Sequence, residues 1–197
     1  MRILINLCEI LLPVLYFATI WVYARAFFSN VKSAERLRTP LLFATLLTHG
    51  TYIALRTAEF QHPPITSMFE ILSLIAFTVA LVYSYIELRL KIKSTGYFIL
   101  ILPFFFQLVS SILIKEVPLI PPILRSNLLG LHVSSALLGY AAITISAVYG
   151  FLYLMLYHDI KSSQFGVIYQ RLPNLETLER MSFTATVFGF ILLTVAI

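Results

Sequence analysis

The sequence predicts an all-α integral membrane protein, a bundle of about six transmembrane helices with the N-terminus outside. Hydrophobic residues make up 59% of the 197 residues and charged residues only 12%, which is too little polar surface to cover a water-soluble globule. The apolar residues fall into six runs, each near the roughly 20 residues that cross a bilayer as a helix. These runs also lack the period-two alternation that an outer-membrane barrel requires.

The six helices are expected over residues 4–27, 40–58, 66–88, 96–114, 128–157 and 180–197. The first run begins almost at Met1 without a polar cleavage region, so we expect a retained helix and not a cleaved signal. No internal repeat, low-complexity tract or long linker divides the chain, which predicts a single transmembrane domain over residues 1–197. The last run reaches Ile197 without a polar or aromatic exit, a pattern typical of a truncated chain.

Lysines and arginines are divided unevenly between the two ends of this bundle. The first, third and fifth connections hold four, three and three of them, ten in total, whereas the other ends hold four. Because basic connections stay in the cytoplasm, the odd-numbered connections are expected there and the N-terminus outside. The outer compartment then receives His132, the connection around His62 and the proline-rich residues 115–127, which are expected to lie on the membrane surface or against the bundle. The ten are Arg25, Lys32, Arg36, Arg38, Arg89, Lys91, Lys93, Lys161, Arg171 and Arg180; the four are Arg2, Arg56, Lys115 and Arg125.

Several function classes are excluded by what the sequence contains. The net charge of +5 does not indicate nucleic-acid binding, because the basic residues lie in short clusters between apolar runs. Cys8 is the single cysteine, so there is no disulfide framework, CxxC redox pair or CxxCH haem-attachment site. No Gly-rich phosphate loop, HExxH motif, nucleophile elbow or zinc-binding cluster is found, and no catalytic residue is predicted. A small-solute transporter would need inverted repeats and broken helices, and neither is seen.

The stretch from Asn127 to His158 is the segment around which the rest is organised. It is rich in small residues, which let other helices or a flat ligand approach the backbone. His132 stands at its head, and no nearby acid in the sequence competes for its proton, so a neutral nitrogen is available to iron. The alternative is an interfacial histidine wetted by headgroups. At 3.6 residues per turn, the small residues on the side of His132 are Ala136, Gly139, Ser146 and Gly150.

Three other histidines and one acid are further candidates for a functional role. His49 lies inside the second helix and is by default a functional group, with a hydrogen bond to a neighbouring helix as the alternative. His62 is expected to be a loop residue, and His158 to meet the C-terminal dipole of its helix. Glu70, at the start of the third helix, is expected to be favoured by the helix dipole, with Thr66 or Ser67 as the cap.

Three segments resemble one known family. They are HPPITSMFEILSLIAF, LHVSSALLGYAAITISAVYGFLYL and LPNLETLERMSFTATVFGFILLTVAI, and the resemblance runs from about residue 41 to residue 197. The family is the cytochrome c assembly proteins of the CcsA, ResC and HemX type, multi-helix membrane proteins that handle haem. The stretch from LHVS to LGYA is the most specific part of the match.

The resemblance implies that His132 is an outer-face haem ligand, paired in the family with a second histidine beyond a tryptophan-rich (WWD) loop on which haem lies. This sequence departs from the family there. Its single tryptophan, Trp21, is in the first helix, and the chain ends where the helix leading into that loop would finish. The remainder is encoded separately, or the chain is a fragment, or it is a degenerate member.

The expected function is therefore a haem-handling subunit of cytochrome c maturation in the inner (plasma) membrane, which presents haem at the outer face. The expected partners are a ResB/CcsB-like membrane protein and apocytochrome c. His132 is the expected delivery ligand for the haem iron, and His49 a transient ligand on the path through the bundle. The chain is not expected to be an enzyme on its own, at most a component of a cytochrome c synthetase complex. The alternative is a HemX-like regulatory protein of tetrapyrrole synthesis without ligation activity.

Overall fold

The computed structural model describes residues 2–29, 31–114, 127–163 and 165–197, and the backbone alone at Asn127. Within these ranges the chain is helical, with no strand. The proline-rich connection expected on the membrane surface lies outside the described residues, apart from the backbone of Asn127. The described helices are α1 (Arg2–Phe28), α2 (Lys32–Phe60), α3 (Met68–Leu90), α4 (Gly96–Leu113), α5 (Asn127–Lys161), α6 (Val167–Arg171) and α7 (Leu175–Val195).

Each of the six expected helices is present, and the differences lie at the helix ends. α2 starts at Lys32 and not at residue 40, because its first two turns are polar helix formers that the apolar run does not include. α7 starts at Leu175, where the side chain of Asn174 accepts a hydrogen bond from the backbone N–H of Thr177 at 2.9 Å. The short α6 was not expected, since five residues leave no periodic apolar pattern to detect.

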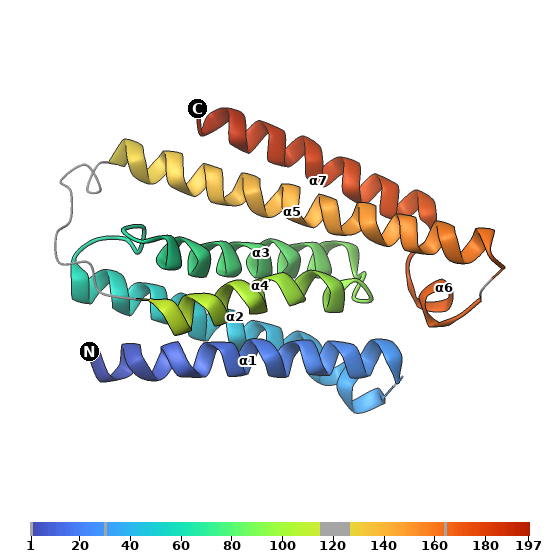
Figure 1. Ribbon diagram of the computed structural model, residues 1–197, viewed down its shortest axis with the longest axis horizontal. Helices are drawn as coiled ribbons and strands as arrows, with labels where there is room; N and C mark the ends of the chain where they lie inside the picture. Colours follow the sequence, from blue (N-terminus) through green and yellow to red (C-terminus); the bar gives the residue numbers. More distant parts are fainter. Residues whose placement is uncertain (1, 30, 115–126, 164) are drawn as a thin grey trace.

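The helices run alternately up and down, so their connections gather at two ends (Figure 1). One end, here called the basic end, holds the connections α1–α2, α3–α4 and α5–α7, which carry most of the lysines and arginines. The other, the terminal end, holds both chain termini, the α2–α3 connection and the start of α5. This is the arrangement that the expected topology requires, with the odd-numbered connections on one side.

Helices α1 to α4 form a four-helix group, and α5 packs against α3 with α7 on its outer side (Figure 1). Of the described helices, five are long and apolar enough to cross a membrane: α1, α3, α4, α5 and α7. α2 has 29 residues and runs alongside α1, but it is less apolar because it carries His49, Arg56 and a charged first turn. The protein is an all-α, multi-pass membrane bundle.

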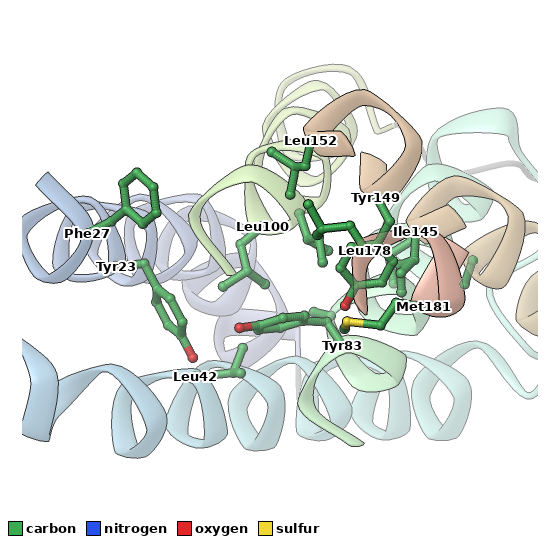
Figure 2. Close-up of a cluster of buried hydrophobic side chains, with 14 of the residues drawn as sticks. Tyr23, Phe27, Leu42, Tyr83, Leu100, Ile145, Tyr149, Leu152, Leu178 and Met181 are labelled. Atoms are coloured by element: carbon green, nitrogen blue, oxygen red, sulfur yellow. The ribbon is translucent and has the colours of Figure 1, made fainter. Parts of the chain in front are cut away.

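Tyrosines and leucines fill the centre of this bundle. Tyr23, Tyr83 and Tyr149 are at most 1% exposed, and Figure 2 shows Tyr83 and Tyr149 among aliphatic side chains of neighbouring helices. Large apolar side chains also cover the outside, for example Trp21 at 56% and Phe183 at 69% exposed. Such a surface suits lipid and not water. Other core members labelled in Figure 2 are Phe27, Leu42, Leu100, Ile145, Leu152, Leu178 and Met181.

Candidate functional site

His132 lies in the second turn of α5, at the terminal end of the bundle, with its side chain exposed. Its Nδ1 is hydrogen-bonded to the backbone carbonyl oxygen of Ala196, just beyond α7. A carbonyl oxygen can only accept, so Nδ1 carries the proton and the lone pair is on Nε2. No described residue is bonded to Nε2. A histidine held by a carbonyl at one nitrogen and open at the other has the geometry of a metal ligand.

The small residues of α5 below His132 pack against α7 and leave no open groove. A Cβ atom added to Gly139 would lie 2.7 Å from Cγ of Leu193, so the two backbones meet there. The hydroxyl of Ser146 lies 2.8 Å from the carbonyl oxygen of Ser182, again on α7. The prediction of an open groove for a flat ligand is therefore wrong between Gly139 and Ser146. The small residues instead allow another helix to approach the backbone closely, which is the second role that the sequence indicated for them.

His49 is fully buried, and both of its ring nitrogens are hydrogen-bonded to neighbouring helices. Nδ1 is 3.0 Å from the hydroxyl of Tyr16 on α1, and Nε2 is 3.0 Å from the hydroxyl of Ser73 on α3. Ser73 donates its proton to Oε1 of Gln107 on α4 at 2.8 Å, so Ser73 accepts from Nε2 of His49. Nδ1 then accepts from Tyr16. The alternative role predicted for His49, a hydrogen bond to a neighbouring helix, is therefore present, and His49 makes such a bond to each of two helices, α1 and α3.

A buried ion triad joins α1, α2 and α3 nearer the terminal end. Nη1 of Arg56 is 3.0 Å from Oε1 of Glu9, and its Nη2 is 2.8 Å from Oε1 of Glu70. The Arg56 side chain is 6% exposed, Glu70 3% and Glu9 19%. The other oxygen of Glu70 accepts from the N–H and hydroxyl of Thr66 at 2.7 and 2.6 Å. Each buried charge therefore has a partner of opposite sign, which a low-dielectric interior demands.

The expected role of Glu70 at the start of its helix is confirmed. Ser67 is the N-cap of α3: its hydroxyl accepts from the N–H of Glu70, and the carboxylate of Glu70 accepts from the N–H of Ser67 at 3.3 Å. This reciprocal pair is a capping box. The link from Glu70 to Arg56 was not foreseen, because it depends on how α2 and α3 pack.

A second buried carboxylate, Glu87, lies near the basic end. Its Oε2 accepts from the hydroxyl of Tyr23 at 2.5 Å and from that of Tyr83 at 2.9 Å, two rings that are labelled in Figure 2. Its Oε1 accepts from the hydroxyl of Thr39 at 2.6 Å, and Nζ of Lys93 lies 4.0 Å away. Glu87 is 1% exposed, so these donors replace water around it.

The two remaining histidines lie at opposite ends. His62 is in the α2–α3 connection, as expected, but it is 6% exposed, and its Nδ1 donates to the carbonyl oxygen of Pro63 at 2.8 Å. His158 is exposed in the last turn of α5, where a dipole interaction is the expected role. Among the residues that the structure describes, no group of three or more His, Cys, Asp or Glu side chains could hold a metal ion.

Sequence reasoning missed Glu87 and Gln107 as buried polar positions and Glu9 as a partly buried one. The available signal was their place inside apolar runs, since a polar side chain in lipid is costly unless a neighbouring helix pairs with it. The charged partners of Arg56 could have been sought on this basis, but the register between helices decides which pairs form.

Comparison with known proteins gives one family. The model of the family described as cytochrome C assembly protein matches residues 4–197. Protein HemX of Brevibacillus brevis is 25% identical over 191 residues, covering 93% of this chain and 68% of that protein. Cytochrome c biogenesis protein CcsA of Guillardia theta is 27% identical over 192 residues, covering 86% of this chain and 63% of that protein.

A second CcsA, from the NIES-293 strain of Heterosigma akashiwo, is 30% identical over 115 residues, covering 56% of this chain and 35% of that protein. The chain thus spans between about one third and two thirds of the length of these curated relatives. No solved structure matches it. Since the family model extends over nearly the whole sequence, the chain belongs to the cytochrome c assembly protein family.

Proposed function

We propose that this protein is a haem-handling membrane subunit of cytochrome c maturation, which presents haem at the outer face of the inner (plasma) membrane for attachment to apocytochrome c. The observation that carries the proposal is His132 in a chain of this family, with an exposed imidazole whose Nδ1 is tied to the carbonyl of Ala196. That geometry leaves Nε2 as the atom that would bind iron. The terminal end would then face the outer compartment.

The surroundings of His132 are suited to an axial ligand of haem iron. The remainder of the haem would be bound by another surface. The carbonyl of Ala196 fixes the tautomer and the orientation of the ring, as second-shell groups do for metal-bound histidines. Haem, when bound, would supply the vinyl groups that are joined to the cysteines of the apocytochrome. The small residues of α5 are covered by α7, so the haem plane must lie beyond the bundle end, where a tryptophan-rich segment or a ResB/CcsB-like partner would hold it.

The test is the haem spectrum of purified protein. The chain, and a version continued through any downstream tryptophan-rich segment, are purified in detergent, and bound haem is measured by absorbance. In the continued version, His132→Ala is expected to lose most of the bound haem or to change its axial-ligand spectrum, and added imidazole is expected to restore the spectrum. His158→Ala is the matched control, because His158 is also exposed and lies at the other end of the same helix.

Two results would reject the proposal. The first is absence of haem from the continued version. The second is an unchanged haem content and spectrum in His132→Ala.

His49 as a transient haem ligand remains a second, separate proposal. Iron could reach either ring nitrogen only if the bond to Tyr16 or to Ser73 were released, because both nitrogens are occupied. In a strain dependent on this protein, cytochrome c is measured for His49→Ala with and without external imidazole. Normal maturation in His49→Ala without imidazole would limit His49 to packing. Rescue by imidazole would support the ligand role.

The alternative function is a HemX-like regulator of tetrapyrrole synthesis without ligation activity, and the match to HemX over 93% of this chain favours it. The described connections at the basic end are short and offer a soluble partner a small surface. The gene neighbourhood separates the two functions. A gene for an enzyme of the tRNA-dependent aminolevulinate pathway would favour the regulator, and genes for a ResB-like protein or apocytochromes would favour maturation.

A further inference from the structure

The basic end of the bundle contains a cavity of about 570 Å³ between the ends of several helices. Four cationic side chains line it, Arg38 from α2, Lys91 and Lys93 from the α3–α4 connection, and Arg171 from the end of α6. Glu35 is the one acidic residue among the described residues that line it. Like charges brought together from three separate segments repel one another, so this lining is stable only with an anion or with water and counter-ions inside.

The hydrogen bonds of the four cations show which of them are already engaged. Arg171 donates from Nη1 to the carbonyl oxygen of Ala26 at 2.8 Å, which fixes its guanidinium at the wall. Lys93 donates to Thr39 at 2.9 Å and lies 4.0 Å from the buried carboxylate of Glu87.

Arg38 and Lys91 are the cations left for a ligand. Nε of Arg38 is buried and has no hydrogen-bond partner in the part of the chain that the structure describes. Lys91 is exposed at the C-cap of α3, in a left-handed backbone conformation with φ 56° that turns the chain toward the cavity lining. The Arg38 side chain also lines the cavity, so an anion there would offset its charge.

The lining also contains apolar side chains, Phe27, Ile92 and Leu172. A cavity that combines cations with apolar walls fits an amphiphile better than a free inorganic anion. Its position adds to this, because it opens where α1 and α3 end, two helices long and apolar enough to cross a membrane, and the headgroups of a bilayer lie near the ends of such helices. Arginine and lysine recognise phosphate through charge-assisted hydrogen bonds.

We propose that this cavity is a binding site for the phosphate of an anionic phospholipid, with the phosphate between Arg38 and Lys91 and the glycerol backbone against Phe27 and Ile92. The proposal is independent of haem binding. It concerns the opposite end of the bundle from His132, and its test contains no haem.

The experiment measures lipid retention by native mass spectrometry. The protein is reconstituted in nanodiscs of phosphatidylcholine mixed with an equal amount of phosphatidylglycerol, extracted gently, and the bound lipids are counted by class. The wild-type chain is expected to retain phosphatidylglycerol in preference to phosphatidylcholine. Arg38→Gln and Lys91→Gln are each expected to lower that preference about tenfold, the effect of one charge-assisted hydrogen bond. Lys91 is exposed, so its variant is expected to fold even if Arg38→Gln does not.

Arg36→Gln is the matched control, since Arg36 is on the same helix and the same end, is exposed, and does not line the cavity. It is expected to leave the preference unchanged. Equal retention of both lipids by the wild type would show that the cavity has no preference for an anionic lipid and would overturn the proposal. An equal loss in Arg36→Gln would show only a diffuse surface charge effect and would overturn it too. In a second arm, pyrophosphate is added to phosphatidylglycerol nanodiscs. Displacement of the lipid at low pyrophosphate concentration would assign the cavity to a soluble phosphate compound and overturn the lipid assignment.

Discussion

Replacing Arg56 by methionine is expected to destabilise the bundle severely. The substitution keeps a long, flexible side chain and removes the one described cation that faces both Glu9 and Glu70. Three N–H···O contacts disappear, from Nη1 to Glu9 at 3.0 Å and from Nη2 and Nε to Glu70 at 2.8 and 3.1 Å. Glu70 on α3 then loses its cation, and Glu9 on α1 loses its contact with Arg56.

The size of the effect follows from the burial of those carboxylates. Removing one partner of a buried ion pair costs about 3 to 5 kcal/mol, because the remaining charge is left without compensation. Glu70 is 3% exposed and would carry most of this cost, while Glu9 at 19% exposed keeps some contact with its surroundings. The donors from Thr66 still hold Oε2 of Glu70, so we expect the low end of the range, about 3 kcal/mol.

The assay is reversible unfolding in mixed detergent micelles with increasing dodecyl sulfate, followed by far-ultraviolet circular dichroism. Arg89→Met is the control, since Arg89 is an exposed arginine whose described hydrogen bond goes to the hydroxyl of Tyr85 at 3.3 Å. That variant is expected to change the free energy of unfolding by less than about 1 kcal/mol, as is usual for exposed charges. Combining Arg56→Met with Glu70→Gln should recover part of the loss, because the stranded charge is removed.

The reasoning would be refuted by a loss below about 1 kcal/mol in Arg56→Met, equal to that of the control. Such a result would mean that water reaches the triad and solvates it as it solvates a surface ion pair. A double variant no more stable than Arg56→Met would also contradict it, since it would show that the carboxylate of Glu70 carries no unpaired charge in the single variant.

Three further outcomes are expected. Gly139→Leu should lower stability by about 1 to 3 kcal/mol by forcing α5 and α7 apart, whereas Gly150→Ala, whose added Cβ would meet its nearest neighbour at 3.9 Å, should be neutral in the same unfolding assay. Glu87→Gln should cost about 1 to 3 kcal/mol, because one carboxylate oxygen becomes an NH2 group that cannot accept, so the hydroxyl protons on that side, either of Tyr23 and Tyr83 or of Thr39, lose their acceptor; a gain in stability would refute this. In a chain whose native cysteine is replaced, a cysteine at Gln61 should react with an impermeable maleimide added to whole cells, and one at Ser94 only after lysis; the reverse pattern would invert the topology.

The helices could be predicted from the sequence because an apolar run of bilayer length has few alternatives to a helix. Polar extensions could not be placed in the same way. The first turns of α2 are helical without being apolar. A prediction based on hydropathy therefore starts this helix at Pro40, eight residues after its first residue, Lys32. The five-residue α6 gives too little periodicity to be detected.

The candidate site was predictable only in part, because its contacts depend on packing between helices. The small residues around Gly139 correctly indicated close approach, but the sequence did not say that α7 would be what approaches. His49 was recognised as unusual, yet its partners Tyr16 and Ser73 are on two other helices. Hydropathy indicates which segments lie in the membrane, whereas the packing and register of neighbouring helices decide which side chains are buried and which of them meet.

The placement of polar groups on α2 has a consequence for how the chain enters the membrane. A charged or polar side chain on an inserting helix is costly, up to about 2.5 to 3.5 kcal/mol for an arginine at the helix centre. α2 carries two such side chains on its buried side, His49 in its interior and Arg56 four residues before its end. Their partners belong to α1, which is synthesised before α2, and to α3, which follows it. The insertion of α2 into the bilayer on its own is therefore expected to be unfavourable. Tyr16 and Glu9 of α1 are already available when α2 is made, so α2 is expected to leave the translocon together with α1, as a hairpin.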